Sequence, residues 1–178
     1  FVAVTPTRVL DTRSNLGLTG AFVSMVSRDL MVTGSITTAD GVQTVVPPGA
    51  SGVVLNLTAV RSNATGYVSV RPADATGTPT TSNLNIAVAD QTVANSVTVK
   101  VPTIGADTGK IELTYNAQSV PAKTTDLVVD IVGYYGTHHH DERYLKLAQP
   151  IVISQSGLDW TAYNTGPTGL DRRVTRTF

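Results

Sequence analysis

Three consecutive histidines stand beside a cluster of charged residues in the stretch GYYGTHHHDERYLKL, at residues 133–147. Imidazole nitrogens bind transition metals, and His138 and His140 have the spacing His-x-His. If three copies of this stretch met at a three-fold axis, these two histidines would supply six nitrogens to one octahedral metal ion. A histidine loop exposed to solvent is the simpler interpretation, and we prefer it. We therefore predict neither a metal site nor a cofactor.

Aromatic residues suggest a second kind of chemistry. Trp160 is the single tryptophan and lies close to Tyr163 in LDWTAYN, while Tyr134 and Tyr135 end the run DLVVDIVGYY. A flat apolar ring stacks on a sugar, or fills a pocket in a protein partner, at a low cost in entropy. All four residues are therefore candidates for a ligand site or an interface, with Trp160 and Tyr163 expected on a loop. The alternative, which we prefer for Trp160, is that it anchors the C-terminal segment to its own neighbours.

An isolated carboxylate offers a third possibility. Asp130 lies between Val128 and Val132 on one face of an expected strand. An unpaired buried charge costs several kcal/mol, so Asp130 must lie on a solvated face or be paired. Arg8 and Arg13, in TPTRVLDTR, are the candidate partners. A structural ion pair is the preferred interpretation, and a catalytic carboxylate is the alternative.

Motifs typical of enzymes are missing from the sequence. It contains no G-x-S-x-G nucleophile elbow, no H-E-x-x-H, no P-loop and no dinucleotide-binding glycine pattern. The histidines all fall in one tripeptide, so a Ser-His-Asp arrangement would have to recruit the junction itself. No pair of acids is marked out for glycoside hydrolysis. We therefore predict that the chain is not an enzyme.

The composition limits what can position these residues. The chain has 178 residues, a hydrophobic fraction of 41% and a charged fraction of only 15%, below the usual quarter. Its formal net charge is zero, which argues against a nucleic-acid partner. No run of about 18 apolar residues occurs, so we expect no insertion into a membrane. Without cysteine there are no disulfides, and the redox compartment stays open.

Short runs of Val, Ile, Leu and Thr bounded by Gly, Pro, Asn or Asp predict an all-β chain. In GVVLNLTAV, for example, Leu55, Leu57 and Ala59 share one face of a strand. We predict strands near residues 1–4, 8–12, 22–33, 42–46, 52–60, 67–71, 82–88, 96–101, 110–115 and 127–135. This number of strands, joined by short loops, favours an antiparallel β-sandwich or jelly-roll-like domain, with a closed barrel as the alternative.

Three segments follow from this pattern. Residues 1–136 are expected to form the β-sandwich domain, residues 137–147 a connector, and residues 148–178 a short C-terminal appendage with one strand near 151–154. The appendage is too short to build its own core, so it must pack on the sandwich, on a partner or on a symmetry mate. The chain begins at Phe1 rather than at Met, which suggests a processed chain or a piece of a longer protein.

Several motifs resemble a known family when taken in order. FVAVTPTRVLDTR, GVVLNLTAV, GYVSVRP, SNLNIAVADQTVANSVTVKV and DLVVDIVGYY are similar to the β-sandwich repeat domain of large secreted proteins of actinobacteria. The resemblance covers residues 1 to about 135, which is about three quarters of the chain. It implies a non-catalytic surface module. The segment at residues 22–46 departs from the family pattern, because it is longer and less rich in glycine.

The junction carries a second resemblance. THHHDERYLKL is similar to the H-D-D-R-Y-Y connector of bacteriophage tail-fibre and minor tail proteins, where it precedes or links trimeric segments. The match rests on His140, Asp141, Arg143 and Tyr144, with His138 beside them. Together the two resemblances imply an extracellular virion protein of an actinobacteriophage, which forms a trimer and contacts other virion proteins and the host surface. The alternative is a secreted, monomeric actinobacterial cell-surface module that binds wall polysaccharide.

Overall fold

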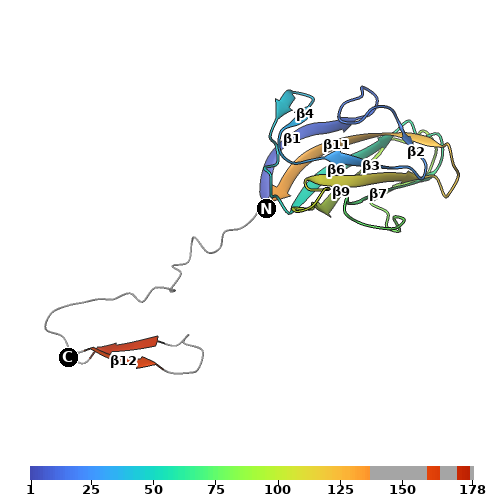
Figure 1. Cartoon of the computed structure of the whole chain (residues 1–178). Helices are drawn as coiled ribbons and strands as arrows, with labels where there is room; N and C mark the ends of the chain where they lie inside the picture. The colour runs from blue at the N-terminus through green and yellow to red at the C-terminus, as the bar shows by residue number, and fades with distance from the viewer. Residues whose placement is uncertain (137–159, 165–171, 177–178) are drawn as a thin grey trace. The chain divides into compact units, whose positions relative to one another are not determined.

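The computed structural model describes residues 1–136, 160–164 and 172–176. The chain divides into two compact units, Phe1–His138 and His139–Phe178. Strands β1 to β11 lie in the first unit, and β12 and β13 lie in the second (Figure 1). The predicted connector at residues 137–147 and the predicted strand at 151–154 fall outside the described residues.

The first unit is all-β, as predicted. Its strands form two main antiparallel sheets, one with the order β1-β11-β6-β9 and β2 beside β11, the other with the order β3-β10-β7-β8, while β4 and β5 form a small hairpin. The strands are β1 (Val2–Asp11), β2 (Phe22–Val23), β3 (Ser27–Met31), β4 (Ile36–Thr38), β5 (Gly41–Gln43), β6 (Gly52–Val60), β7 (Gly66–Pro72), β8 (Leu84–Ile86), β9 (Val93–Lys100), β10 (Lys110–Asn116) and β11 (Thr124–Tyr135). Among the described residues, no helix has the length and apolarity that crossing a bilayer requires.

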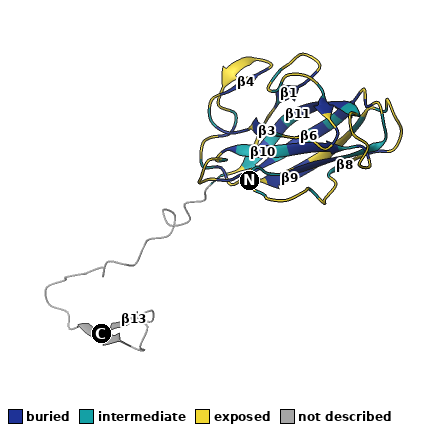
Figure 2. Ribbon diagram, turned by 45° about the vertical axis from the view of Figure 1, so that its right-hand side comes forward, coloured by how far each residue is buried: buried dark blue, intermediate teal, exposed yellow. Residues whose placement is uncertain are grey.

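The core lies between the two main sheets. Leu55, Leu57 and Ala59 of β6 are fully buried, as the two-residue period of the sequence predicts. Leu113 of β10 and Val68 of β7 are fully buried in the same core from the other sheet. Figure 2 shows this alternation as buried and partly buried positions that follow one another along the central strands. Two antiparallel sheets facing each other make a β-sandwich rather than a closed barrel.

The N-terminal strand is longer than predicted. The expected strands at residues 1–4 and 8–12 form one strand, β1, which pairs with β11 along its length. The register shifts between Ala3 and Thr7, and again between Arg8 and Leu10. Pro6 lies within the first irregularity, and because proline has no backbone N–H, it cannot donate to a regular ladder there.

The predicted strand at residues 22–33 was wrong as a single element. Its first part is β2, which pairs with β11, and its second part is β3, which pairs with β10 in the opposite sheet. The chain changes sheets at residues 24–26. Met25 adopts the left-handed conformation there, with φ 68°, and the N–H of Val26 donates to the carbonyl oxygen of Val23 at 3.1 Å. Residues 36–46 also differ from the prediction, since they hold the β4–β5 hairpin.

The second unit contains a hairpin of β12 (Trp160–Asn164) and β13 (Arg172–Arg176). The strands are antiparallel, with Trp160 opposite Arg176 and Tyr163 opposite Arg173. The prediction that Trp160 and Tyr163 lie on a loop was therefore wrong. Tryptophan, threonine and tyrosine favour strands, and this preference was given too little weight beside the Gly, Pro and Asn residues around them.

Shortening a buried side chain of β6 is expected to destabilise the sandwich. Leu57→Ala removes a fully buried side chain and should lower the free energy of unfolding by about 3 kcal/mol, the usual cost of a leucine-sized cavity. Urea denaturation of both proteins measures this difference. The control Val42→Ala changes a side chain that is 71% exposed and should cost less than about 0.5 kcal/mol. Equal costs at both positions would contradict the core described above.

Candidate functional site

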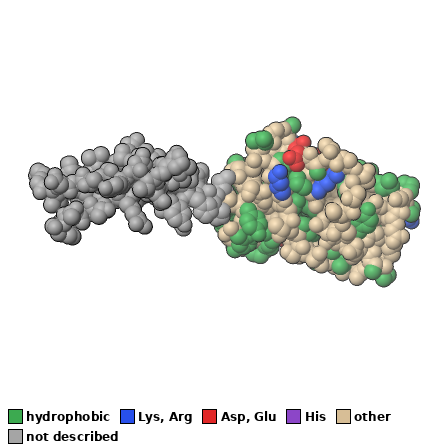
Figure 3. Space-filling model, turned by 90° about the horizontal axis from the view of Figure 1, so that it is seen from below, with side chains coloured by type: hydrophobic (Ala, Val, Ile, Leu, Met, Phe, Trp, Pro, Cys, Tyr) green, Lys and Arg blue, Asp and Glu red, His purple; other side chains and the backbone are tan. Residues whose placement is uncertain are grey.

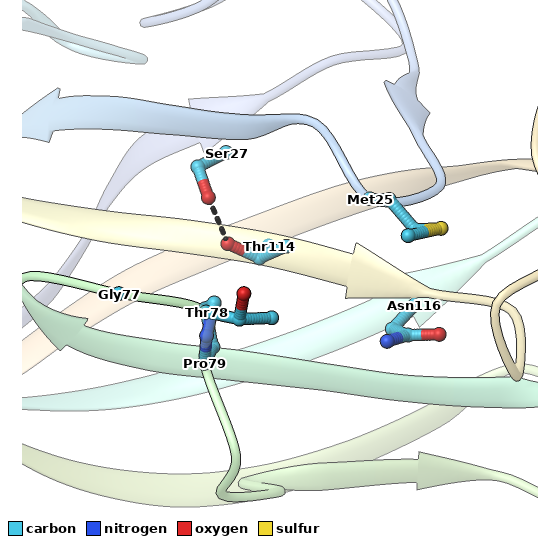
Figure 4. Close-up of a pocket in the computed structure, with 7 residues that line it drawn as sticks. All are labelled: Met25, Ser27, Gly77, Thr78, Pro79, Thr114 and Asn116. Carbon is cyan, nitrogen blue, oxygen red and sulfur yellow. Dashed lines mark hydrogen bonds between the residues drawn. The ribbon is translucent and has the colours of Figure 1, made fainter.

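A hollow of about 230 Å³ lies on the outer face of the β3-β10-β7-β8 sheet (Figure 4). Ser27 of β3 and Thr114 and Asn116 of β10 form its floor. Met25, in the turn between β2 and β3, and residues 77–79, in the loop after β7, form its walls. Three segments that are far apart in the sequence therefore meet at this site.

The floor is polar because of the strand period. In β10, Ile111, Leu113 and Tyr115 are buried in the core, so the residues between them face outward. Thr114 and Asn116 are two of these outward residues. Ser27 is the cross-strand partner of Thr114, which places the two hydroxyl groups side by side.

Hydrogen bonds hold the floor in place. The Ser27 Oγ and Thr114 Oγ1 atoms lie 2.7 Å apart, and either hydroxyl can be the donor. The Asn116 amide Nδ2 donates to the Tyr67 hydroxyl at 3.0 Å, and its Oδ1 accepts from the N–H of Ser119 at 2.7 Å. Each hydroxyl donates one hydrogen bond and accepts two, so unused capacity remains on the floor. The result is a fixed array of uncharged donors and acceptors.

The loop wall is tied to the sheet on both sides. Arg71 Nη1 donates to the carbonyl oxygen of Thr76 at 3.4 Å, before the wall. The Ser69 hydroxyl donates to the carbonyl oxygen of Thr81, after it. Residues 77–79 lie between these two anchors, and Figure 4 shows Thr78 and Pro79 beside β10, on the side of β7. The wall is therefore attached to β7 by hydrogen bonds from two of its side chains to main-chain carbonyls of the loop.

Met25 forms the opposite wall. Its side chain is 54% exposed, although methionine is usually buried. Its N–H donates to the carbonyl oxygen of Tyr115 at 2.8 Å, and this bond fixes the residue against β10. Met25 also has a positive φ of 68°, which costs a non-glycine residue conformational energy. The turn thus presents a polarisable, apolar thioether beside a polar floor.

The hollow is lined by uncharged groups. Its lining has no ionisable side chain. The carboxylate nearest the hydroxyl pair is Glu112, whose Oε1 lies 3.4 Å from Thr114 Oγ1. Arg71 Nε lies 2.7 Å from the same Oε1, so this carboxylate is held in an ion pair. The geometry suits a small neutral ligand that carries hydroxyl or amide groups.

The structure pairs Asp130 with one of its two candidate arginines. Arg8 is its cross-strand partner, and Arg8 Nε and Nη2 donate to Asp130 Oδ1 and Oδ2 at 2.8 and 3.3 Å. The hydrogen bond to Asp130 raises the pKa of the Arg8 guanidinium. Arg13 is a correction: it lies beyond the end of β1 and pairs with Asp11, with Nη2 and Oδ2 2.6 Å apart. The turn after β1 brings Arg13 back onto its own strand rather than across to Asp130.

Sequence analysis missed a second acid on β11. The Thr12 hydroxyl donates to Asp126 Oδ1 at 2.6 Å, and Arg61 Nη2 lies 2.8 Å from Asp126 Oδ2. The N–H of Leu127 donates to the Thr12 hydroxyl, which closes the link between β1 and β11. In the sequence, the only indication of this contact was Thr12, the threonine of LDTR. Each carboxylate in this region has an arginine partner, which is the pattern of a structural network.

The aromatic candidates separate into exposed and covered positions. Tyr135 is 40% exposed, and its ring centroid lies 5.6 Å from that of Phe1. Tyr134 is half-buried and packs against the core. The side chains of Trp160 and Tyr163 lie outside the described residues. So do all the connector candidates, which are His138, His140, Asp141, Arg143 and Tyr144.

Few other features compete with the hollow. Within residues 1–136, 160–164 and 172–176, no group of three or more His, Cys, Asp or Glu residues is placed to hold a metal ion. Figure 3 shows one face of the molecule, where charged side chains are sparse and uncharged polar and hydrophobic atoms cover most of the described surface.

No protein-family model, curated protein or solved structure matches this chain.

The Asp11–Arg13 pair predicts a pH dependence of stability. The hydrogen bond from Arg13 lowers the pKa of Asp11 below its usual value of 3.8. The pair therefore contributes its full stabilisation above that value, and the contribution is lost as the pH falls through the lower folded pKa. Asp11→Asn should reduce the loss in free energy of unfolding between pH 5 and pH 2, as measured by urea denaturation. Asp74→Asn, the same change at an exposed turn residue, should leave that loss intact. An unchanged slope in Asp11→Asn would contradict the assignment.

Proposed function

We propose that this chain is a non-catalytic adhesion protein of a virion whose β-sandwich binds a neutral glycan of the host cell surface. The tail-fibre, minor tail and decoration proteins are the classes that fit. The observation that supports binding is the hollow on the outer face of the β3-β10-β7-β8 sheet, with its uncharged polar floor and partly apolar walls. The likeness of the junction to phage connectors supports the virion.

A sugar matches the hollow in its chemistry. Pyranose hydroxyl groups both donate and accept hydrogen bonds, as do Ser27, Thr78 and Thr114. The C–H faces of a sugar ring suit the apolar surfaces of Met25 and Pro79. The volume of about 230 Å³ lies below the roughly 300–1,000 Å³ of sites for drug-sized ligands. One ring of a longer glycan is therefore the expected occupant.

The virion assignment rests on the motifs alone. The connector-like run at residues 137–147 implies a trimer, in which other virion proteins would be partners. A secreted actinobacterial surface module is the second candidate. The ordered motifs across residues 1–135 favour it, because they resemble domains of secreted proteins. Both candidates bind a cell-surface polysaccharide, so the hollow does not separate them.

Filling the hollow should weaken binding. Thr78→Trp places a large ring in the site from an exposed loop residue, so the fold should be preserved. We expect its affinity for isolated actinobacterial cell walls to fall by at least about tenfold, the effect of losing roughly 1.4 kcal/mol of contacts. Co-sedimentation of the purified protein with the walls measures this.

The matched control is Thr80→Trp, two residues further along the same loop. Thr80 is exposed and does not line the hollow, so its substitution adds the same ring outside the site. It should bind like the unsubstituted chain. A similar loss in both variants, or full binding by Thr78→Trp, would remove the support that the hollow gives to the proposal.

The oligomeric state separates the two candidates. We expect light scattering to give three times the chain mass of 18.7 kDa for residues 1–178, and a monomer for a chain that ends at Gly136. The reason is that the connector and the C-terminal segment would act as the assembly device. Monomers in both cases would favour the secreted surface module.

A further inference from the structure

A second exposed surface lies on the outer face of the other sheet, where β1 begins and β11 ends. Phe1 and Tyr135 form an aromatic pair there, with ring planes at 58° and exposed fractions of 55% and 40%. The carbonyl oxygen of Tyr135 accepts from the N–H of Ser51 at 2.8 Å, so its backbone is anchored to the segment before β6. The two residues are thus held in place while their rings remain in contact with solvent.

A glycine lets the Phe1 ring lie against the sheet. A Cβ on Gly133 would overlap the Phe1 ring, so a side chain there would displace it. Gly52 is the cross-strand partner of Tyr135, and a Cβ built on it would be in ordinary contact with the Tyr135 ring, 3.5 Å from Cδ2. The two rings form an exposed pair and are not coplanar.

The exposed area indicates the size of the partner. A phenylalanine or tyrosine offers about 150–250 Å² when fully exposed, so these two rings present roughly 200 Å². A stable protein–protein interface needs about 800 Å² from each partner. The aromatic pair by itself therefore suits a small ligand better than a protein surface.

We propose that Phe1 and Tyr135 form a stacking platform for a pyranose ring. The neighbouring groups supply the polar contacts that a sugar requires. Lys100 is the cross-strand partner of Gly52 on β9, and Thr98 is the partner of Val54 beside it. Both are exposed, as is Ser51. A ring stacked on Tyr135 would place its hydroxyl groups near these donors and acceptors.

This platform is independent of the hollow. Met25 follows β2, which pairs with Thr124 and Thr125 at the start of β11, whereas Tyr135 ends the same strand. The twelve residues of β11 span about 40 Å, so one sugar ring cannot contact both places. The inference shares the ligand class of the proposed function and rests on that function for its biological meaning, but not on the geometry of the hollow.

The test is an NMR titration of the ¹⁵N-labelled full chain with linear hexasaccharides of glucose, mannose and galactose. At least one should shift the amide signals of Ser51, Gly52 and Tyr135 in a saturable way. Tyr135→Ala should weaken this binding about fivefold to tenfold, the size of one aromatic stacking contact. Tyr135→Phe keeps the ring and should bind as the unsubstituted chain does, which also controls for folding.

Other outcomes distinguish this inference from the proposed function. The control Val42→Ala, which removes a 71% exposed side chain in the β4–β5 hairpin, should change nothing. Shifts confined to the hollow would overturn the platform and leave the proposed function standing, while shifts at neither place would overturn both. Broadening around Phe1 and Tyr135 that grows with protein concentration and ignores sugar would identify a contact between copies and overturn the platform. Thr78→Trp should remove only the shifts at the hollow.

Discussion

The antiparallel pairing of β1 with β11 is the constraint on which the rest of the sandwich depends. It joins residues 122 positions apart in the sequence, and the two hydrogen bonds between Arg8 and Asp130 help to hold its register. A slip of β1 by one residue would turn Leu10, which is fully buried, away from the core. The pairing also places the two chain ends of the sheet and the change of sheet at opposite ends of the domain. The chain enters and leaves the sheet at one end, beside Phe1 and Tyr135, and crosses to the other sheet at the opposite end (Figure 1).

The hollow depends on that crossing. Since β2 belongs with β11 and β3 with β10, the chain must turn sharply between them, and Met25 accepts a left-handed conformation to do so. The conformational energy stored there is offset by the bond from its N–H to Tyr115 and by the bond from the N–H of Ala117 to the Ser24 hydroxyl. The same turn leaves the thioether exposed beside the Ser27–Thr114 pair. The turn that the fold needs for the change of sheet thereby supplies one wall of the hollow.

Sequence periodicity predicted the features that depend on neighbours along the chain. The buried face of Leu55, Leu57 and Ala59 follows from alternation, and the need of Asp130 for a partner follows from the cost of an unpaired charge. The hollow could not be predicted in this way, because its lining comes from residues 25–27, 77–79 and 114–116. Nor does the run at residues 24–26 contain the glycine, proline or asparagine that usually marks a turn. The platform likewise needs the Phe1 ring to lie over Gly133, which no local pattern encodes.

Two small proposed sites on opposite sheets would allow a surface with few charged residues to bind a polysaccharide. Association of free molecules loses about 4–15 kcal/mol of translational and rotational freedom, which contacts to one sugar ring offset only in part. A polysaccharide repeats its units, so a chain with two subsites, presented three times in the proposed trimer, would bind many units at once. Linked contacts of this kind raise apparent affinity by about 100- to 10,000-fold without any stronger single site. Because stacking and uncharged hydrogen bonds are little screened by salt, such attachment would persist across ionic strengths that weaken a charged interface.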